Sequence, residues 1–187
     1  MGQLQSYLKL CSYKYFLVIH RLMAEPLTDF FIEDIFLRDL YTQKIYKGFI
    51  YPRGNINIRE EISKIKPPAI YVVNTDYKKR GGLHWILLVY LENKTLFLDP
   101  FGFSNLTYNY PFLVERAIAP VTRNIFKVQN WHTRSISCGH FIIIYGLMIA
   151  RNFSLYEINN YFHPVDTEFN DILAIDFVIW LKEYMDQ

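Results

Sequence analysis

The middle of the chain is dominated by apolar runs of strand length. Residues 69–74 (AIYVVN), 84–91 (HWILLVYL) and 95–99 (TLFLD) are nearly continuous hydrophobic runs bounded by turn-forming residues, which is typical of buried β-strands. Asn93-Lys94, in the short link between the second run and the third, is predicted to be a tight turn. These two runs are therefore predicted to form an antiparallel hairpin.

Helical patterns lie outside this central region. Thr28 can cap a helix in which the apolar residues 31, 32, 35 and 36 recur at helical spacing. Pro111 suits the first turn of a second helix, predicted over residues 109–119. A fourth strand is predicted to follow it over residues 124–129 (NIFKVQ).

The C-terminal part of the chain is predicted to be helical. Residues 138–151 are apolar on all sides, which indicates a buried helix. Ser154 and Glu157 form the capping-box pattern of a short helix, and residues 166–184 have the pattern of an amphipathic one. Strands gathered in the middle with helices at both ends predict an α+β fold, a central mixed or antiparallel sheet flanked by helices.

Composition is that of a folded protein. With 187 residues, 51% of them hydrophobic and 18% aromatic, the chain can bury a sizeable core, which excludes wholesale disorder. No apolar run approaches the roughly 18–20 residues of a transmembrane helix, so no membrane association is expected. Residues 1–22 show no clear helical or strand period and are expected to be an N-terminal appendage, while residues 23–187 are expected to form one domain.

Charge is distributed unevenly. Residues 51–134 hold twelve Lys and Arg against six Asp and Glu, whereas residues 151–187 hold two against seven. The basic middle could face DNA or an acidic partner, although solvated loops are the commoner reason for such a surplus. The two cysteines, Cys11 and Cys138, are too few for a disulfide framework or a cysteine metal cluster, and a reducing, intracellular setting is expected.

Candidate chemistry begins at His84, which opens a strand directly after a glycine turn. Asp99 ends the partner strand of the predicted hairpin. With the turn placed as above, paired residue numbers should sum to about 187; these two sum to 183, so they are expected to lie nearly opposite each other. A carboxylate in that place would accept the imidazole N–H and fix its tautomer.

Cys138 stands where a polar loop meets the start of a buried helix. The positive end of the helix dipole favours a thiolate there, and a neighbouring histidine would favour it further. Gln129 ends the strand before this loop, so its amide could join the Cys138 backbone N–H as an oxyanion donor. A cysteine, a histidine and an aspartate are each more often structural residues, and only their combination suggests a nucleophile, a base and an orienting group.

Four further residues are candidates for substrate contact: Asn74, Gly82, Trp85 and Gly139. Asn74 and Gly82 lie before and within the glycine turn, Trp85 adjoins the candidate base, and Gly139 would leave room for a substrate backbone. His132 and His140 flank Cys138, and His140 is expected to be structural. No metal site is predicted, because these residues lack a fourth well-spaced ligand.

Four stretches carry a resemblance to a known family: residues 35–52 (IFLRDLYTQKIYKGFIYP), 69–90 (AIYVVNTDYKKRGGLHWILLVY), 96–104 (LFLDPFGFS) and 128–145 (VQNWHTRSISCGHFIIIY). They contain, in order, Val-Asn-Thr at a strand end, Gly-Gly before His-Trp, an acid-Pro-Phe-Gly-Phe-Ser motif, and Cys-Gly opening a helix. In these motifs the chain resembles the adenovirus endopeptidases (adenains), cysteine proteases of the wider group that includes the ubiquitin-like-protein-specific proteases.

The resemblance implies that family's fold, with the nucleophile at the N-terminus of a buried helix. It implies Cys138 as nucleophile, His84 as general base, Gln129 as oxyanion donor, and Asp99 where the family more often has Glu. The implied activity is that of a thiol protease, a hydrolase that cleaves viral capsid or core precursor proteins at Gly-containing sites during virion maturation. The protein is then expected in the host nucleus or at the site of virus assembly, and in the virion. The expected source is an adenovirus-like virus or a Polinton-type element.

Cofactors and partners follow from the same resemblance. No cofactor is required for the chemistry, and a monomer is expected. The family implies activation by a viral peptide and by DNA, and DNA contact would use the basic residues 51–134. Cys11, the only other cysteine, lies in a segment that the family lacks, so a disulfide-linked peptide is not predicted. Gln129 and Cys138 are also slightly farther apart than is usual in the family.

Two other functions stay open. A deubiquitinase or deSUMOylase-type isopeptidase would use the same triad, and a catalytically dead domain could serve as a binding module for capsid or nucleic acid. The Asp-Pro-Phe-Gly-Phe motif at residues 99–103 favours a viral protease, and the intact set of candidate residues argues against a dead one.

Overall fold

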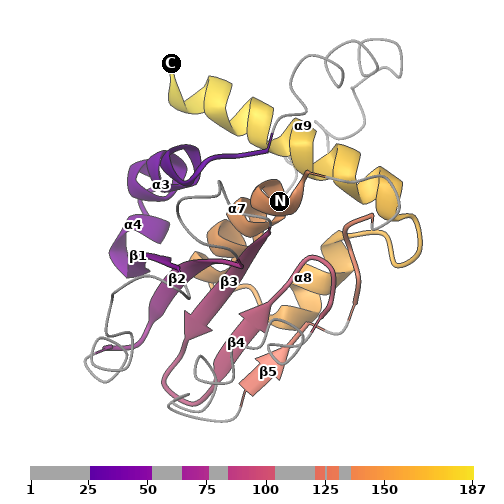
Figure 1. The fold of residues 1–187 in the computed structure, drawn as a ribbon. Helices are drawn as coiled ribbons and strands as arrows, with labels where there is room; N and C mark the ends of the chain where they lie inside the picture. The colour runs from indigo at the N-terminus through magenta and orange to yellow at the C-terminus, as the bar shows by residue number, and fades with distance from the viewer. Residues whose placement is uncertain (1–25, 52–64, 76–83, 104–120, 125, 131–135) are drawn as a thin grey trace.

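A mixed sheet forms the centre of the protein (Figure 1). The structure, a computed structural model, describes residues 26–51, 65–75, 84–103, 121–124, 126–130 and 136–187. The strand order is β1-β2-β3-β4-β5, with the bounds Tyr46–Ile50, Ala69–Asn74, Trp85–Tyr90, Thr95–Leu98 and Val121–Arg123. The strands β2, β3 and β4 are antiparallel neighbours, whereas β1 is parallel to β2 and β5 is parallel to β4.

Helices pack on this sheet and on one another. They are α3 (Asp29–Arg38), α4 (Thr42–Ile45), α7 (Cys138–Ala150), α8 (Leu155–Tyr161) and α9 (Thr167–Met185). Helix α7 packs against β3, and both α3 and α9 pack against α7 (Figure 1). The predicted α+β class is confirmed, and α7 and α9 end within one residue of their predicted bounds. Among the described helices, none has the length and hydropathy needed to cross a bilayer.

Both faces of the sheet are buried at its central strands. Leu87 and Val89 of β3 join the core shared with α7, while the alternate residues Ile86 and Leu88 belong to a second cluster on the opposite face. Side chains alternate between faces along a strand, so burial of both faces requires an apolar residue at every position. This explains why β3 reads as a continuous hydrophobic run.

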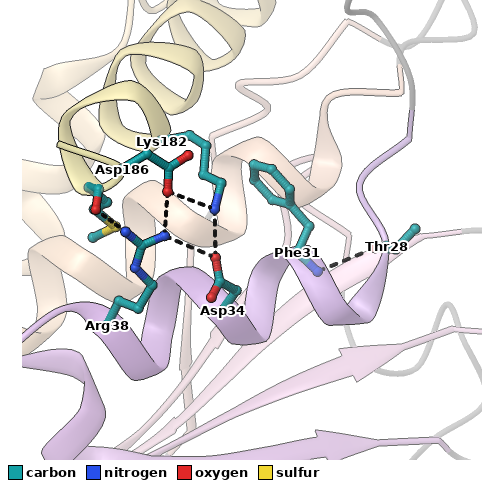
Figure 2. Close-up of polar contacts among 7 residues, drawn as sticks. Thr28, Phe31, Asp34, Arg38, Lys182 and Asp186 are labelled. Carbon is teal, nitrogen blue, oxygen red and sulfur yellow. Dashed lines mark hydrogen bonds and ion pairs between the residues drawn. The ribbon is translucent and has the colours of Figure 1, made fainter.

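Helix α3 begins where the sequence predicts. The Thr28 side chain accepts the Phe31 backbone N–H at 3.3 Å and caps the helix (Figure 2). Its buried face meets α7 at Gly146, where an added Cβ would fall on the Phe36 ring. The glycine therefore permits the close approach of α3 and α7.

Polar side chains tie the end of α9 to α3. Lys182 Nζ lies 2.8 Å from Asp34 Oδ2, and Arg38 Nη1 lies 2.7 Å from Asp186 Oδ1 (Figure 2). Arg38 also donates to the Met185 carbonyl. Exposed ion pairs of this kind each contribute little stability, but together they set where the end of α9 lies against α3.

The predicted hairpin is confirmed with its turn one residue earlier. Leu91 N–H donates to the Lys94 carbonyl at 2.9 Å, so the two-residue loop is Glu92-Asn93 and not Asn93-Lys94. Paired residue numbers therefore sum to 185, as in the pair Leu87 and Leu98. The sum differs from the expected 187 by two, an even number. His84 and Asp99 therefore still lie on the same face of the sheet.

The strand predicted over residues 124–129 is wrong, because the strand in this region is β5, Val121–Arg123. After β5, the backbone N–H groups of Val128 and Gln129 both donate to the Pro100 carbonyl at 3.0 Å, beyond the end of β4. Strand β1 was not predicted, since Lys47 and Gly48 interrupt its apolar pattern. The helix predicted over residues 109–119 and the appendage predicted over residues 1–22 lie outside the described residues.

Candidate active site

His84 and Asp99 meet at one end of the β3–β4 hairpin. His84 directly precedes β3, and Thr75 N–H donates to its carbonyl at 2.9 Å, which extends the β2–β3 ladder by one residue. Continuing the β3–β4 register places Asp99 opposite Ile86, which shares a sheet face with His84 because side chains alternate. His84 Nε2 lies 2.7 Å from Asp99 Oδ1, and the two residues are 6% and 0% exposed.

Phe101 and Asn124 hold this pair in place. The Phe101 backbone N–H donates to Asp99 Oδ1 at 2.8 Å, so this oxygen interacts with both Phe101 and His84. Asn124 accepts the Asp99 backbone N–H at 2.7 Å and donates to the Asp99 carbonyl at 2.6 Å. The Phe101 ring stacks on the imidazole, with ring centroids 4.5 Å apart. The carboxylate, its backbone and the face of the imidazole are therefore all constrained.

Sequence reasoning did not identify either residue as part of the site. Asn124 was placed inside the wrongly predicted strand over residues 124–129, and nothing in its neighbours marks it as a partner of Asp99. Phe101 had a signal, because it belongs to the acid-Pro-Phe motif. A turn directly after a candidate orienting carboxylate is a place to look for a backbone donor to that carboxylate.

Asp99 and Cys138 both raise the pKa of the His84 imidazole. Burial lowers the pKa of the His84 imidazole, but hydrogen bonds with Asp99 and Cys138, together with the charges of both, outweigh burial and raise the pKa to about 9. An imidazole with this pKa carries its second proton at neutral pH. Asp99 and Cys138 therefore both favour the imidazolium form of His84.

Helix α7 determines where the sulfur lies. Cys138 is the first residue of this 13-residue helix, whose N-cap is Ser137, so the sulfur lies at the positive end of the helix dipole as predicted. Cys138 is a buried free cysteine. His140, in the first turn of the same helix, is also buried, and His132 lies outside the described residues. Within the described residues, no group of three or more His, Cys, Asp or Glu side chains is arranged to hold a metal ion.

Gln129 is fully buried beside the segment that follows Asp99. Its backbone N–H donates to the Pro100 carbonyl at 3.0 Å, which ties it to the residue next to Asp99. Gln129 therefore lies in an irregular segment, whereas the sequence predicts it at the end of a strand. Its role as an oxyanion donor stays a prediction.

Of the four candidates for substrate contact, Gly82 lies outside the described residues. Trp85 Nε1 donates to the Leu27 carbonyl at 3.0 Å. A Cβ added at Gly139 would lie 2.9 Å from Leu27 Cβ and 3.3 Å from the Trp85 ring. The protein itself thus fills the space beside Gly139, and internal packing accounts for a glycine there. Asn74 is buried opposite Trp85 at the end of β2, and substrate contact by these residues stays a prediction.

The chain matches the model of one known protein family. The family model of the adenovirus endoprotease matches residues 61–166, a range that includes His84, Asp99 and Cys138. No curated protein sequence matches the chain.

The solved structures that match the chain include two proteases and an uncharacterized protein. The crystal structure of the ASFV pS273R protease is 14% identical with a TM-score of 0.52, and the match covers 81% of this chain and 67% of that one. The central domain of an uncharacterized Legionella pneumophila protein is 13% identical with a TM-score of 0.48, covering 85% and 99%. SUMO protease Ulp1 is 11% identical with a TM-score of 0.44, covering 81% and 78%.

The family match extends over more than half of the chain and contains the His84–Asp99 pair and the cysteine that acts on it. The likeness to the ASFV protease supports the same fold. The chain therefore belongs to the adenovirus endoprotease family and is a cysteine peptidase.

Proposed function

We propose that Cys138 is the nucleophile of this peptidase, that His84 is its general acid and base, and that Asp99 orients the imidazole. The observation that carries the proposal is the 2.7 Å contact between His84 Nε2 and Asp99 Oδ1 on a ring whose pKa Cys138 also raises. Both partners of the imidazole stabilise its protonated form. This is what a thiolate–imidazolium nucleophile requires.

The reaction proceeds by acyl transfer. The Cys138 thiolate attacks the peptide carbonyl, and the negative charge moves to the carbonyl oxygen, where the Gln129 amide and the Cys138 backbone N–H donate to it. The tetrahedral intermediate collapses, the C–N bond breaks, and His84 gives its proton to the leaving amine. His84 then takes a proton from water, whose oxygen attacks the thioester and releases the acid and the thiolate.

The proposed substrates are viral capsid or core precursor proteins, cleaved at Gly-containing sites during virion maturation. Membership of the adenovirus endoprotease family supports this choice. The enzyme would then act where virions assemble, in the host nucleus or at another assembly site, and in the virion, as a monomer encoded by an adenovirus-like virus or a Polinton-type element.

Activation by a viral peptide or by DNA belongs to the same proposal. The chemistry above needs no cofactor, so an activator would act on the geometry of the site. The surplus of Lys and Arg over residues 51–134 supports a DNA contact. A peptide activator would bind without a disulfide, because Cys11 is the only cysteine besides Cys138 and lies in the N-terminal segment.

The test compares the two cysteines. Peptides with Gly before the scissile bond are incubated with the wild-type protein, with Cys138→Ala, with His84→Ala and with Cys11→Ala as the matched control. Each protein is tested with and without DNA and capsid-derived peptides. Cleavage that disappears in Cys138→Ala and His84→Ala but survives in Cys11→Ala supports the proposal. Cleavage retained by folded Cys138→Ala overturns the assignment of the nucleophile.

The same preparations separate the alternative functions. Hydrolysis of ubiquitin or SUMO conjugates in preference to Gly-containing peptides would indicate a deconjugating isopeptidase. Failure of Cys138 to react with a thiol-selective alkylating agent at neutral pH would indicate a binding module without catalysis.

A further inference from the structure

Helix α9 contributes none of the proposed catalytic residues, yet it contacts both ends of the segment that connects Gln129 to Cys138. Asp171 Oδ1 accepts the Ser137 hydroxyl at 2.8 Å and the Asn130 backbone N–H at 3.3 Å. Asn130 follows Gln129, and Ser137 precedes Cys138. One carboxylate oxygen thus joins the residue after the proposed oxyanion donor to the residue before the proposed nucleophile.

The Ser137 side chain interacts with α9 and does not cap its own helix. A serine at a helix N-cap ordinarily accepts a backbone N–H from the first turn of its own helix. At the start of α7 no such side-chain cap is formed, and the hydroxyl donates to Asp171 instead. The contact therefore links the start of α7 to α9.

The neighbouring residue strengthens the attachment. Asn170 Nδ2 donates to the Val128 carbonyl at 3.2 Å and to the His163 carbonyl at 2.9 Å, and its Oδ1 accepts the His163 backbone N–H at 2.7 Å. Val128 directly precedes Gln129. Asn170 is 0% exposed and Asp171 is 9% exposed, so these hydrogen bonds face little competition from water.

Helix α9 is itself held in place at its other end. Lys182 and Asp186 contact Asp34 and Arg38 of α3, the helix that packs against α7 (Figure 2). The helix is therefore fixed against the rest of the fold at both ends and can act as a rigid support. We infer that Asp171 is a positioning residue that sets the spacing between Gln129 and Cys138, an inference that rests on the catalytic roles proposed above.

The spacing matters because the oxyanion forms only during reaction. A donor must lie about 2.7–3.1 Å from the place of the developing charge, and loss of one donor costs about 10²–10³-fold in kcat. Misplacement by about 1 Å can cost about 10²-fold. Alkylation of the thiolate by iodoacetamide forms no oxyanion, so it reports on Cys138 and His84 without needing Gln129 in place.

The experiment measures kcat, KM and the rate of iodoacetamide alkylation for Asp171→Ala, Asp171→Asn and Ser137→Ala. Glu168→Ala, an exposed acidic residue of the same helix, is the matched control. For Asp171→Ala we expect kcat to fall about 10²-fold, with KM and the alkylation rate within about threefold of wild type. Asp171→Asn keeps an oxygen that accepts both hydrogen bonds and should recover most of the activity.

The inference is overturned if kcat of folded Asp171→Ala stays within about threefold of wild type. It is also overturned if kcat and the alkylation rate fall in parallel, because the substitution would then act on the thiolate. If Asp171→Ala does not fold, Ser137→Ala decides in the same way, with an expected loss of about tenfold. A wild-type protein that cleaves no peptide, or a folded Cys138→Ala that still cleaves, would instead contradict the proposed function.

Discussion

His84 Nε2 lies 2.7 Å from Asp99 Oδ1 although the two residues are not direct partners in the β3–β4 hairpin. The register places Asp99 opposite Ile86, two residues beyond His84, on the same face of the sheet. The contact therefore joins diagonal and not directly paired positions of the two strands. It depends on the hydrogen bonds that fix Asp99.

Asp99→Asn should remove the negative charge that supports the His84 imidazolium. We expect the pKa of His84 to fall from about 9 toward the ordinary histidine value of 6.5. The limb of the kcat/KM profile at which activity is lost on raising pH should move to lower pH, and kcat/KM at its optimum should drop by about 10²–10⁴-fold. Glu92→Gln, in the exposed hairpin loop, is the control. An unchanged alkaline limb in Asp99→Asn would contradict the role given to Asp99.

Protonation of His84 should also make stability depend on pH. The pKa of His84 is higher in the folded protein, about 9, than the ordinary 6.5, so the folded state holds the proton more tightly. Its stabilising contribution is complete below pH 6.5 and is lost as the pH rises through 9. We expect the free energy of unfolding in urea to fall by up to about 3 kcal/mol over this window.

The matched variant for that experiment is His84→Gln, which cannot be protonated. Its unfolding free energy should change less than that of the wild type between pH 6 and pH 9. Equal pH dependence in the two proteins would show that His84 does not carry the effect.

Asn124→Ala should impair catalysis without touching the proposed triad. The substitution leaves the buried N–H and C=O of Asp99 without two hydrogen bonds, of 2.7 and 2.6 Å. Each unsatisfied buried group costs about 1–3 kcal/mol, which urea denaturation would detect. We also expect a lower kcat, because Asp99 is less firmly held. Asn160→Ala, an exposed asparagine on α8, should change neither quantity.

Gly146→Ala should destabilise the contact between α3 and α7. An added Cβ would fall on the Phe36 ring, and overpacking of this kind costs about 1–3 kcal/mol. The double variant Gly146→Ala, Phe36→Leu should recover part of the loss in urea denaturation, because the shorter side chain makes room. If the second substitution only adds to the loss, the clash is not the cause.

Local patterns predicted the parts of the fold and site that depend on neighbours in sequence. The apolar runs of β2, β3 and β4, the Thr28 cap of α3 and the capping box at Ser154 are all found in the structure. Because a short hairpin ties His84 to Asp99, their meeting could be predicted from residue numbers alone. A turn misplaced by one residue changed the register without changing the face.

Contacts between distant segments could not be predicted in this way. Asn124 reaches Asp99 across 25 residues, and Asp171 reaches Ser137 across 34. Each depends on how whole elements pack, and a single asparagine or aspartate in a mixed pattern carries no sign of its partner. Gly139 has a packing reason that the sequence does not show, since a Cβ added there would meet Leu27 and Trp85, and its contact with substrate stays a prediction.

In the proposed reaction, Cys138 is activated by His84 and attacks the carbonyl carbon of a peptide bond. The most direct measurement is mass spectrometry of the protein after treatment with a peptide vinyl sulfone that ends in Gly and captures a catalytic thiolate. We expect a single adduct on Cys138, formed by the wild type and by Cys11→Ala and lost in His84→Ala. An adduct on Cys11, or equal labelling of Cys138 with and without His84, would contradict it.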